Sequence, residues 1–548
     1  MASHISRRAV LGGFAVGTGA LVLAGCSTSS PGGGSGGAPS GSTGGLPTYS
    51  AFGDVTAEFP GTPDGALDAF ANYPTNPVAF TDGPPGDGSP ITALTSPQGT
   101  VPAAMAQNGY WQELNARIGS EMDLRLVATD YDAALATTLA GGDVPDLVSV
   151  PFNTPARRAG KAAMFSALAL DLSEYLGGDL VQAYPALANI PTAAWEMASF
   201  GGVVRAIPIH RGMSSSSFML VRQDVAEAQG IDTAITDYDS FRELCLAMTR
   251  PRENQFAIAR NPMPYLKGMF RVPAVWQLGE DGTLTSQYDF REEYHAALLA
   301  AQELCAAGTF HPDWIPDDIQ VALHDRFYAG TALMTIHNQL AITAAYKANQ
   351  DVEGFQVGLL GFPGHDGGDG TPPRMNPKEV HSLCFVNRES ADRAETLLRV
   401  LDLLAAPFGT AEYLFNKFGR EGDEFTFDGA NPIANEDQVN NVRLGQQYLA
   451  DGPQVTYLPG RSSEEVQIVH AAQAALAEVG VFDPTVGFES ATEQATGADF
   501  GTAVGDVENE IIQGRASIAE WDELVDRWLD GDGAQIKAEY EEAFATQA

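Results

Sequence analysis

The sequence predicts an α/β protein in which helices cover a parallel sheet. From Ile91 onward, short apolar strands alternate with amphipathic helical segments, which is the pattern of β-α-β units. Hydrophobic residues make up 44% of the 548-residue chain, enough for a substantial folded core. About 460 residues follow residue 88, more than one core usually supports, so we expect two lobes.

The alternation begins with three strands and two helices. Strands are predicted at 91–96 (ITALTS), at 122–129 (MDLRLVAT) and at the end of GGDVPDLVSV, residues 141–150. The helix after the first strand carries an apolar stripe from Trp111 to Ile118. The helix before the third strand begins at Tyr131, and Asp130 is in position to cap it. This series implies parallel pairing of the three strands.

The alternation of predicted strands and helices continues in the later part of the chain. GGVVRAIPI predicts a glycine turn followed by a strand, and GEDGTLT predicts a hairpin. Further strands are predicted in ALMTIHN, FQVGLLGFP and HSLCFVN, and an amphipathic helix from Ser390 to Leu404. Capping boxes at Ser462/Glu465 and Ser517/Glu520 begin two C-terminal helices. Residues 46–88 are dense in proline and glycine and predict an ordered but irregular lead-in.

The N-terminus has the pattern of an exported, anchored protein. Arg7 and Arg8 precede an apolar run that is too short and too glycine-rich for a lasting membrane-spanning helix, so residues 1–25 are predicted to be a cleaved signal. The run LAGC ending at Cys26 resembles the lipobox of bacterial lipoproteins, whose cysteine is acylated. The alternative is an ordinary signal peptide with Cys26 near the cleavage point by chance. SRRAVL also resembles a twin-arginine signal, with valine in place of the usual phenylalanine. Residues 26–45 are predicted to be a flexible Gly/Ser tether.

Charge and cysteine content narrow the class of protein. The chain carries 70 acidic and 31 basic residues, a net charge of −39, and has no basic patch interleaved with aromatics, so we expect no nucleic-acid binding. Cys245, Cys305 and Cys384 lie in apolar contexts and are predicted to be free thiols, with a Cys245–Cys305 disulfide left open. None has the spacing of metal ligands, and we expect neither metal nor cofactor.

No sequence motif indicates catalysis. The chain lacks a nucleophile elbow, an H-E-x-x-H zinc motif, a phosphate-binding loop and a dinucleotide fingerprint. HPDWIPDD predicts a solvated loop, and DGDG at 530–533 a helix-ending turn rather than a calcium loop. The carboxylate pair of a glycosidase stays open, because so many acidic residues allow many pairs.

Four segments, taken in order, resemble extracellular solute-binding proteins of ABC transporters, of the carbohydrate-binding type. These segments are ATTLAGGDVPDLVSV, SSFMLVRQDVAEAQGI, YAGTALMTIHNQLAI with FQVGLLGFPG, and IIQGRASIAEWDELVDRWLDGDGAQIKAEYEEAF. The resemblance runs from Ile91 to the end, whereas the lead-in and the polar SSSS at 214–217 depart from it. It implies a two-lobed periplasmic-binding-protein (Venus-flytrap) fold, with crossing strands as a hinge and lobes that close over a solute.

The resemblance and the element order together divide the chain. We expect the first part of lobe 1 at 89–205, the main part of lobe 2 at 206–353, a return to lobe 1 at 354–400, and C-terminal helices packing on both lobes at 401–548.

A sugar site needs aromatic platforms for C–H faces and polar side chains for hydroxyls, placed where strands end. The candidates are Asn338, His337, Arg205, His210, Arg211, Phe152, Asn153, Asp130, Trp111, Phe362 and Arg374. Asn338 and His337 lead, because the resemblance places polar cleft residues after the MTI strand. Phe362 and Arg374 flank a glycine-rich loop, and His210 and Arg211 stand before the serine run.

The remaining candidates each have a structural alternative. For Trp111 core packing is favoured over a stacking platform, and for Asp130 a helix cap is favoured over a ligand. Phe152 and Asn153 are balanced between loop packing and site. Arg205 is expected in the crossing strand, with an interlobe salt bridge as its alternative role.

The sequence therefore predicts a non-catalytic, membrane-tethered lipoprotein that captures a carbohydrate, an oligosaccharide in the first instance, for an ABC importer. We expect a monomer on the extracellular face of the cell membrane, held there only by lipid on Cys26, with the transporter permease as its protein partner. A tethered polysaccharide-degrading enzyme and a binder of peptides or other small solutes on the same fold are the alternatives.

Overall fold

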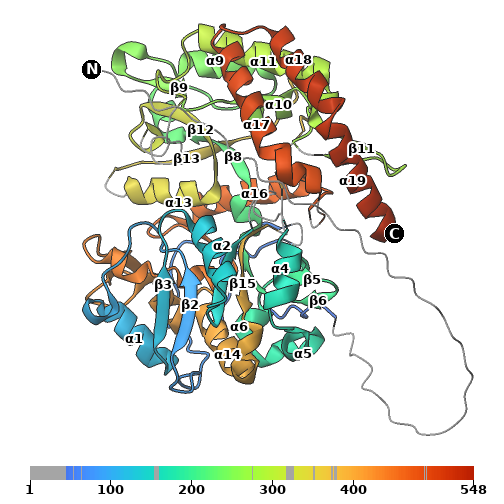
Figure 1. Ribbon diagram of the computed structural model, residues 1–548. Helices are drawn as coiled ribbons and strands as arrows, with labels where there is room; N and C mark the ends of the chain where they lie inside the picture. The colour runs from blue at the N-terminus through green and yellow to red at the C-terminus, as the bar shows by residue number, and fades with distance from the viewer. Residues whose placement is uncertain are drawn as a thin grey trace, which may run out of the picture. The chain divides into compact units, whose positions relative to one another are not determined.

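The computed structural model describes residues 45–53, 55–62, 65–152, 160–274, 276–315, 326–349, 352–371, 374–375, 379–486, 488 and 490–547. The predicted signal, Cys26 and the tether up to residue 44 lie outside these residues. Strands and helices alternate along the described chain and build one five-stranded and one four-stranded sheet (Figure 1). The predicted α/β class is confirmed.

The five-stranded sheet contains all three strands of the first β-α-β series. Its strands are β2 (Ile91–Thr95), β3 (Met122–Leu126), β4 (Leu147–Pro151), β7 (Ile207–His210) and β15 (Val380–Val386), in the order β3-β2-β4-β15-β7. β2 pairs in parallel with β3 and β4, as predicted. β15 runs antiparallel to both β4 and β7, so the sheet is mixed rather than purely parallel.

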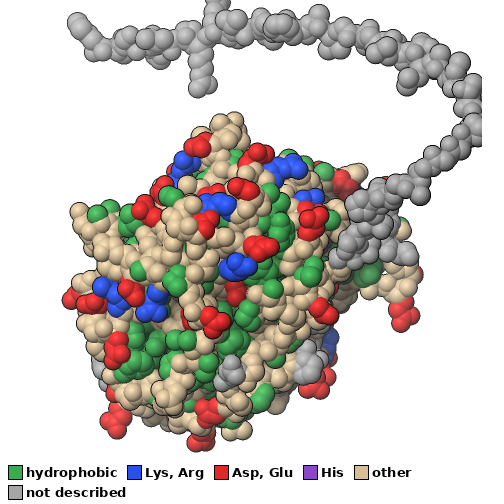
Figure 2. Space-filling model, turned by 90° about the horizontal axis from the view of Figure 1, so that it is seen from below, with side chains coloured by type: hydrophobic (Ala, Val, Ile, Leu, Met, Phe, Trp, Pro, Cys, Tyr) green, Lys and Arg blue, Asp and Glu red, His purple; other side chains and the backbone are tan. Residues whose placement is uncertain are grey.

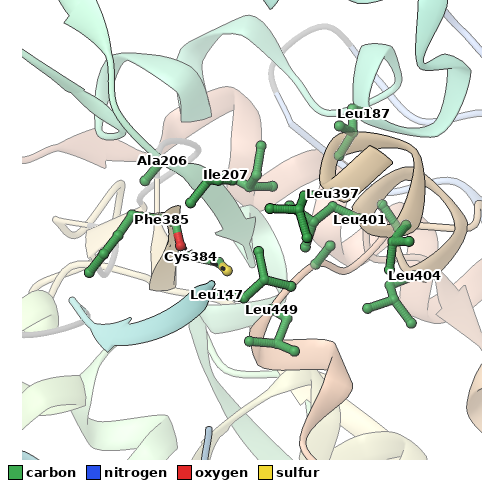
Figure 3. Packing of buried hydrophobic residues seen from close by; sticks show 14 of the residues in the cluster. Leu147, Leu187, Ala206, Ile207, Cys384, Phe385, Leu397, Leu401, Leu404 and Leu449 are labelled. Carbon is green, nitrogen blue, oxygen red and sulfur yellow. Dashed lines mark hydrogen bonds between the residues drawn. The ribbon is translucent and has the colours of Figure 1, made fainter. Parts of the chain in front are cut away.

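Helices bury both faces of this sheet in one large core. They are α1 (Gly109–Ile118), α2 (Tyr131–Gly141), α4 (Lys161–Leu168), α5 (Ser173–Leu176), α6 (Pro185–Ala188), α7 (Thr192–Glu196), α14 (Ala394–Leu404) and α15 (Ala411–Phe418). Figure 3 shows Leu397, Leu401 and Leu404 of α14 in this core, together with Leu147, Ile207 and Cys384 from the strands. The three leucines lie four and three residues apart, so one helix face carries them.

The four-stranded sheet has apolar side chains on both faces. It consists of β8 (Ser217–Arg222), β9 (Phe256–Ile258), β12 (Ala332–Asn338) and β13 (Val357–Leu360), in the order β13-β8-β12-β9. β8 runs antiparallel to β12 and β13, and β9 runs parallel to β12. Phe218 and Leu220 join one core and Met219 and Val221 another, because successive strand side chains point to opposite faces.

Two groups of helices cover these faces. The core of Met219 and Val221 includes residues of α8 (Gln223–Ala228), α9 (Tyr238–Ala247), α10 (Met263–Met269), α11 (Arg291–Ala306), α17 (Ala491–Ile512) and α18 (Ile518–Leu529). The core of Phe218 and Leu220 includes residues of α13 (Gln339–Ala348) and α16 (Ser463–Val479). Both predicted capping boxes are present, at the starts of α16 and α18.

Several two-stranded pairs complete the fold. They are β1 (Ala69–Phe70) with β18 (Thr456–Tyr457), β5 (Ser199–Phe200) with β6 (Val203–Val204), β10 (Gln277–Leu278) with β11 (Leu284–Thr285), β14 (Arg374–Met375) with β19 (Val481–Phe482), and β16 (Phe425–Asp428) with β17 (Asn431–Ala434). The β10–β11 pair is the predicted hairpin. It packs beside the final helix, α19 (Asp532–Gln547), through Leu284, Ile536 and Tyr540.

The lead-in is ordered and largely without regular structure, as predicted. Its β1 pairs with β18 from far along the chain. Tyr73 is buried, and its hydroxyl donates to the carbonyl of Thr410 at 2.8 Å. The lead-in is therefore an integral part of the folded unit.

Two boundaries differ from the sequence prediction. β7 belongs to the five-stranded sheet, so the chain leaves that sheet after His210 and not at residue 206. β13 keeps the chain in the four-stranded sheet as far as Leu360, beyond the predicted return at 354. Both strands are short and apolar, and such a strand pattern does not reveal which sheet it joins.

The helix predicted to begin at Ser390 begins four residues later. Ser390 lies within a 3₁₀ turn, Arg388–Arg393, with non-helical φ and ψ of −97° and 19°. Its hydroxyl donates to Asp146 Oδ1 at 2.6 Å instead of capping a helix. α14 then runs to Leu404 as predicted.

The three described cysteines are free thiols, which closes the question of a Cys245–Cys305 disulfide. Cys245 and Cys384 are buried, and burial raises the pKa of both thiols. Cys305 is only partly buried.

On the face shown in Figure 2, acidic and basic side chains lie scattered among apolar ones.

A buried carboxyl group in α14 makes the stability of the five-stranded half depend on pH. Asp402 Oδ1 accepts the backbone N–H groups of Ala186 and Leu187 at 2.8 and 2.9 Å, yet burial raises the pKa of Asp402 to about 7. The folded protein therefore holds this proton up to about pH 7, whereas the unfolded chain releases it near pH 4. The stability that this group contributes falls as pH rises between these values.

We expect Asp402→Asn to remove this pH dependence, because the amide oxygen still accepts both N–H groups and carries no charge. Between pH 5 and pH 8 the free energy of unfolding of the wild type should fall by roughly 2 kcal/mol more than that of the variant. Denaturant unfolding of both proteins at the two pH values measures this difference. An equal change in both would show that Asp402 titrates normally.

Candidate ligand-binding site

The chain passes between the two main sheets several times, and three of these crossings concern the candidate site. The first, residues 211–216, leads from the end of β7 to the start of β8. The second, residues 361–379, leads from the end of β13 to the start of β15. The third, residues 451–457, leads from Ala450 in the core of the five-stranded sheet to Leu458 in a core of the four-stranded sheet. Both sheets belong to one unit, Gly44–Ala548.

These crossings define one edge on each sheet. β2, β3, β4 and β7 all end at the edge of the five-stranded sheet from which the first crossing departs. On the four-stranded sheet, Asn338 at the end of β12 pairs with Ser217 at the start of β8, where that crossing arrives. Because α/β proteins bind ligands beyond the carboxyl ends of their strands, these two edges form the candidate site.

Asn338 and His337 lie on the edge of the four-stranded sheet, at the end of β12, and both side chains are partly buried. Asn338 is the residue before α13, but its side chain makes no capping bond with that helix. Its backbone N–H donates to His337 Nδ1 at 2.8 Å, and its side-chain Oδ1 lies 3.2 Å from the same nitrogen. The two side chains therefore stay together at this edge, and the helix does not use the Asn338 amide.

His210 and Arg211 lie at the opposite edge, where the first crossing begins. His210 is buried and pairs with Val380 of β15. Arg211 Nη1 lies 2.9 Å from Asp451 Oδ2, and Lys417 Nζ lies 2.5 Å from Asp451 Oδ1. The guanidinium of Arg211 is thus engaged in an ion cluster that joins the first and third crossings. This cluster explains structurally why an arginine precedes the serine run.

Arg205 does not lie at either edge, so its prediction as a crossing residue is wrong. It precedes β7, and its Nη1 donates to the carbonyl of Ala169 at 3.3 Å. Ala169 adjoins Leu170, whose N–H donates to Val386 at the far end of β15. Arg205 therefore lies at the opposite end of the five-stranded sheet from His210.

Two predicted aromatic candidates belong to the core. Trp111 is 7% exposed, and its indole Nε1 donates to the carbonyl of Met122 at 3.1 Å. Phe152 follows β4 at the candidate edge but is 4% exposed, with its ring packed edge-on against Phe165 and Phe200. Both rings are buried in this structure and are not presented as stacking platforms.

Asp130 follows β3 at the candidate edge and is exposed. It precedes α2, as predicted, but its side chain makes no capping bond, so that part of the prediction is wrong. Its φ of 51° places it in the left-handed region, away from the extended backbone typical of a capping residue. The carboxylate therefore stays a candidate ligand group.

The remaining candidates lie on the second crossing or outside the described residues. Phe362 follows β13 on the second crossing, partly buried, with its ring centroid 5.1 Å from that of Tyr265. Arg374 lies in β14, which pairs with β19, and its side chain is outside the described part. Asn153 and Cys26 also lie outside the described residues.

The structure adds an aromatic pair that the sequence analysis missed. The rings of His381 and Tyr448 stack with centroids 4.9 Å apart and planes at 19°. His381 lies at the bulge that begins β15, and its carbonyl accepts the N–H of Phe152 at 3.1 Å. Both side chains are partly buried. They place a flat, partly polar surface at the edge of the five-stranded sheet, and nothing in the sequence near Tyr448 signals this contact.

Arg260 is a second missed residue, two positions beyond β9 on the edge that carries Asn338. The apolar FAI at 256–258 is a short strand, and an arginine two residues after a strand is a polar strand-end residue like the predicted ones. Choosing polar residues at strand ends, as for the predicted candidates, would have identified Arg260 from the sequence.

Three hollows lined by described residues include none of the predicted site residues in their linings. One of about 460 Å³ is lined mainly by α17 and the turn that follows, including Asp506 and Glu510. One of about 340 Å³ lies in the lead-in beside Tyr73, and one of about 230 Å³ beside Glu412. The candidate site therefore rests on strand ends and their side chains.

The described residues contain neither a metal-binding cluster nor a membrane-spanning helix. Within the ranges given above, no group of histidine, cysteine, aspartate or glutamate side chains is arranged to hold a metal ion. Over the same ranges, no helix combines the length and apolar character needed to cross a membrane.

No family model and no curated protein matches the sequence, but solved structures match the fold. An N-glycan transport solute binding protein (NgtS) from Streptococcus pneumoniae is 13% identical, with a TM-score of 0.59 over 84% of this chain and 100% of that chain. An HMO binding ABC-transporter associated solute binding protein from Bifidobacterium longum infantis is 17% identical, with a TM-score of 0.59 over 83% of this chain and 99% of that chain. The alginate-binding protein AlgQ2 is 13% identical, with a TM-score of 0.58 over 85% and 99% of the two chains.

The chain has the two-lobed fold of solute-binding proteins. The fold that the sequence resemblance implied is thereby confirmed. In this solute-binding fold, the five-stranded and four-stranded sheets are the cores of the two lobes, and the three crossings connect them. At 13–17% sequence identity, this likeness establishes the architecture of the chain.

Proposed function

We propose that the protein captures a carbohydrate, an oligosaccharide in particular, between its two sheet edges and delivers it to an ABC importer without catalysis. The observation that carries this proposal is the pairing of polar side chains on one edge with an aromatic surface on the other. His337 and Asn338 offer hydrogen bonds to hydroxyl groups, and the stacked rings of His381 and Tyr448 offer a face for C–H groups.

The solutes named for the matched structures support the same class of ligand. One protein is named for N-glycan transport, one for binding HMO and one for binding alginate. A further match, FusA from S. pneumoniae, was solved in complex with kestose, at 13% identity and a TM-score of 0.53. We infer that this chain, too, takes a saccharide of several units.

The arrangement on the membrane is part of the proposal. Residues 1–25 would serve as the export signal, and acylated Cys26 would anchor the chain to the extracellular face of the membrane through the tether at 26–45. In this arrangement the two lobes, covering residues 89–400 with the exchanges noted above, remain free to close on the solute and to dock on a permease. The C-terminal helices after residue 400 support both lobes.

Thermal unfolding against a panel of neutral and acidic mono- and oligosaccharides tests the proposal. A ligand that binds only the folded state adds about 2.7 kcal/mol at a hundredfold excess over Kd, so at least one saccharide class should raise the melting temperature. Mass spectrometry of the recovered saccharide should show it unaltered. If no saccharide of the panel raises the melting temperature, the carbohydrate assignment is contradicted. If mass spectrometry finds that the recovered saccharide has been shortened, the protein is an enzyme instead.

A further inference from the structure

Arg260 belongs to the same sheet edge as Asn338. In the pairing of β9 with β12, Phe256 lies opposite Ala332 and Ile258 opposite Met334. The N–H of Ala259 donates to the carbonyl of Met334 at 3.0 Å, so the two chains are still in register there. One step further, Arg260 reaches the level of Ile336, directly before His337 and Asn338.

The charge of Arg260 has no partner within the described chain. Its side chain is partly buried but makes no hydrogen bond, ion pair or ring contact with any described residue. Other arginines near the crossings are paired, Arg211 with Asp451 and Arg222 with Asp224 at 2.8 Å. Arg252 and Arg527 share the lack of a partner in the described chain, but both are exposed, where water solvates the charge.

An unpaired cation in such a place is costly for the folded protein. Removing a guanidinium from water without a counter-charge costs free energy, and desolvation by burial lowers the pKa of Arg260. The chain has 70 acidic residues, more than twice the number of its basic ones, yet none of the described carboxylates forms an ion pair with Arg260. A ligand that brings an anionic group to the edge would relieve this cost.

We propose that Arg260 binds an anionic group of the solute, and that the captured saccharide is therefore an acidic one that carries carboxylate or sulfate groups. This inference rests on the proposed function and specifies its substrate class. A guanidinium offers a planar fork of N–H donors that matches the two oxygens of a carboxylate or sulfate. His337 and Asn338, next along the same edge, would then bind hydroxyl groups of the same or the neighbouring sugar.

The experiment compares ligands that differ only in charge. The full-length protein is titrated calorimetrically with oligogalacturonides, with the same oligomers methyl-esterified to remove the charge, and with sulfated and unmodified galacto-oligosaccharides of equal length. We expect the wild type to bind at least one acidic series at least about tenfold more tightly than its neutral counterpart, the range of one charge-assisted hydrogen bond. The series that binds identifies carboxylate or sulfate as the anionic group.

Variants of Arg260 assign the effect to this residue. Arg260→Gln should weaken binding of the acidic series about tenfold or more and leave neutral oligomers nearly unaffected. Arg260→Lys keeps the charge without the fork, so it should retain part of the acidic preference. Arg252→Gln is the matched control, because Arg252 also lacks a partner in the described chain but is exposed and lies at the other end of β9. It should bind like the wild type.

Each contrary outcome has a distinct meaning. If the protein binds neutral oligosaccharides and rejects acidic ones, the inference is wrong and the proposed function stands. An equal loss of acidic and neutral ligands in Arg260→Gln would give Arg260 a structural role and overturn the assignment. If no saccharide binds at all, both the proposed function and this inference are wrong. The melting temperature of each unliganded variant shows that it is folded.

Discussion

Asp451→Asn is expected to lower the free energy of unfolding by about 3 kcal/mol, because it leaves two cations without their shared counter-charge. The Asp451 side chain is 3% exposed and lies within 2.9 Å of Arg211 and 2.5 Å of Lys417. Arg211 stands on the first crossing and Asp451 on the third. Loss of this cluster should therefore weaken the connection between the lobes as well as the fold. The midpoint of guanidinium unfolding measures the effect.

Asp143→Asn provides the matched control. Asp143 also pairs with an arginine, Arg125, but at 3.7 Å and with its side chain 96% exposed. Exposed pairs of this kind contribute little, so this variant should unfold at the wild-type midpoint. If Asp451→Asn also unfolds at the wild-type midpoint, the cluster does not hold the crossings together.

Asn338→Ala is expected to abolish the stabilisation that a bound saccharide gives, while the unliganded protein melts almost as the wild type does. The reason is that the Asn338 side chain makes no capping bond to α13 and contacts only its partly buried neighbour His337 among the described residues, so its truncation removes little from the free protein. Its amide is a donor and an acceptor at the edge where the ligand would lie. Thermal unfolding with and without the best saccharide of the panel separates the two effects.

Two further variants test whether the loss of binding is specific to the candidate site. Tyr448→Ala, on the edge of the five-stranded sheet, should also weaken binding, because the proposal needs both edges. Asn76→Ala, an exposed asparagine of the lead-in, should leave binding unchanged. Retained affinity in Asn338→Ala would remove this residue from the site. Loss in the Asn338 variant alone would restrict the site to one lobe.

Local sequence patterns were sufficient to predict most elements of the fold. The stripe from Trp111 to Ile118 became α1, the run from Ala332 to Asn338 became β12, and the capping box at Ser462 begins α16. These features depend on neighbouring residues, whose periodicity and hydrogen bonds are visible in the sequence. Asn338 and His337 could be placed at a strand end for the same reason.

The errors arise where distant segments meet. The sequence does not show that β7 pairs with β15, and this pairing decides that Arg205 lies far from the candidate edge. It does not show that Tyr448 stacks on His381, or that no described carboxylate pairs with Arg260. Phe152 was correctly placed after a strand, but packing against Phe165 and Phe200 turned its ring into the core. Such relations depend on tertiary contacts between residues far apart in the chain.

Small-angle X-ray scattering with and without a saturating saccharide tests the central claim most directly. If the two lobes close on a ligand held between their sheet edges, the radius of gyration should fall when the saccharide binds. The Asn338→Ala variant, under the same conditions, should keep the unliganded value. An unchanged radius of gyration in the wild type, under conditions where calorimetry shows saturated binding, would contradict capture between the lobes.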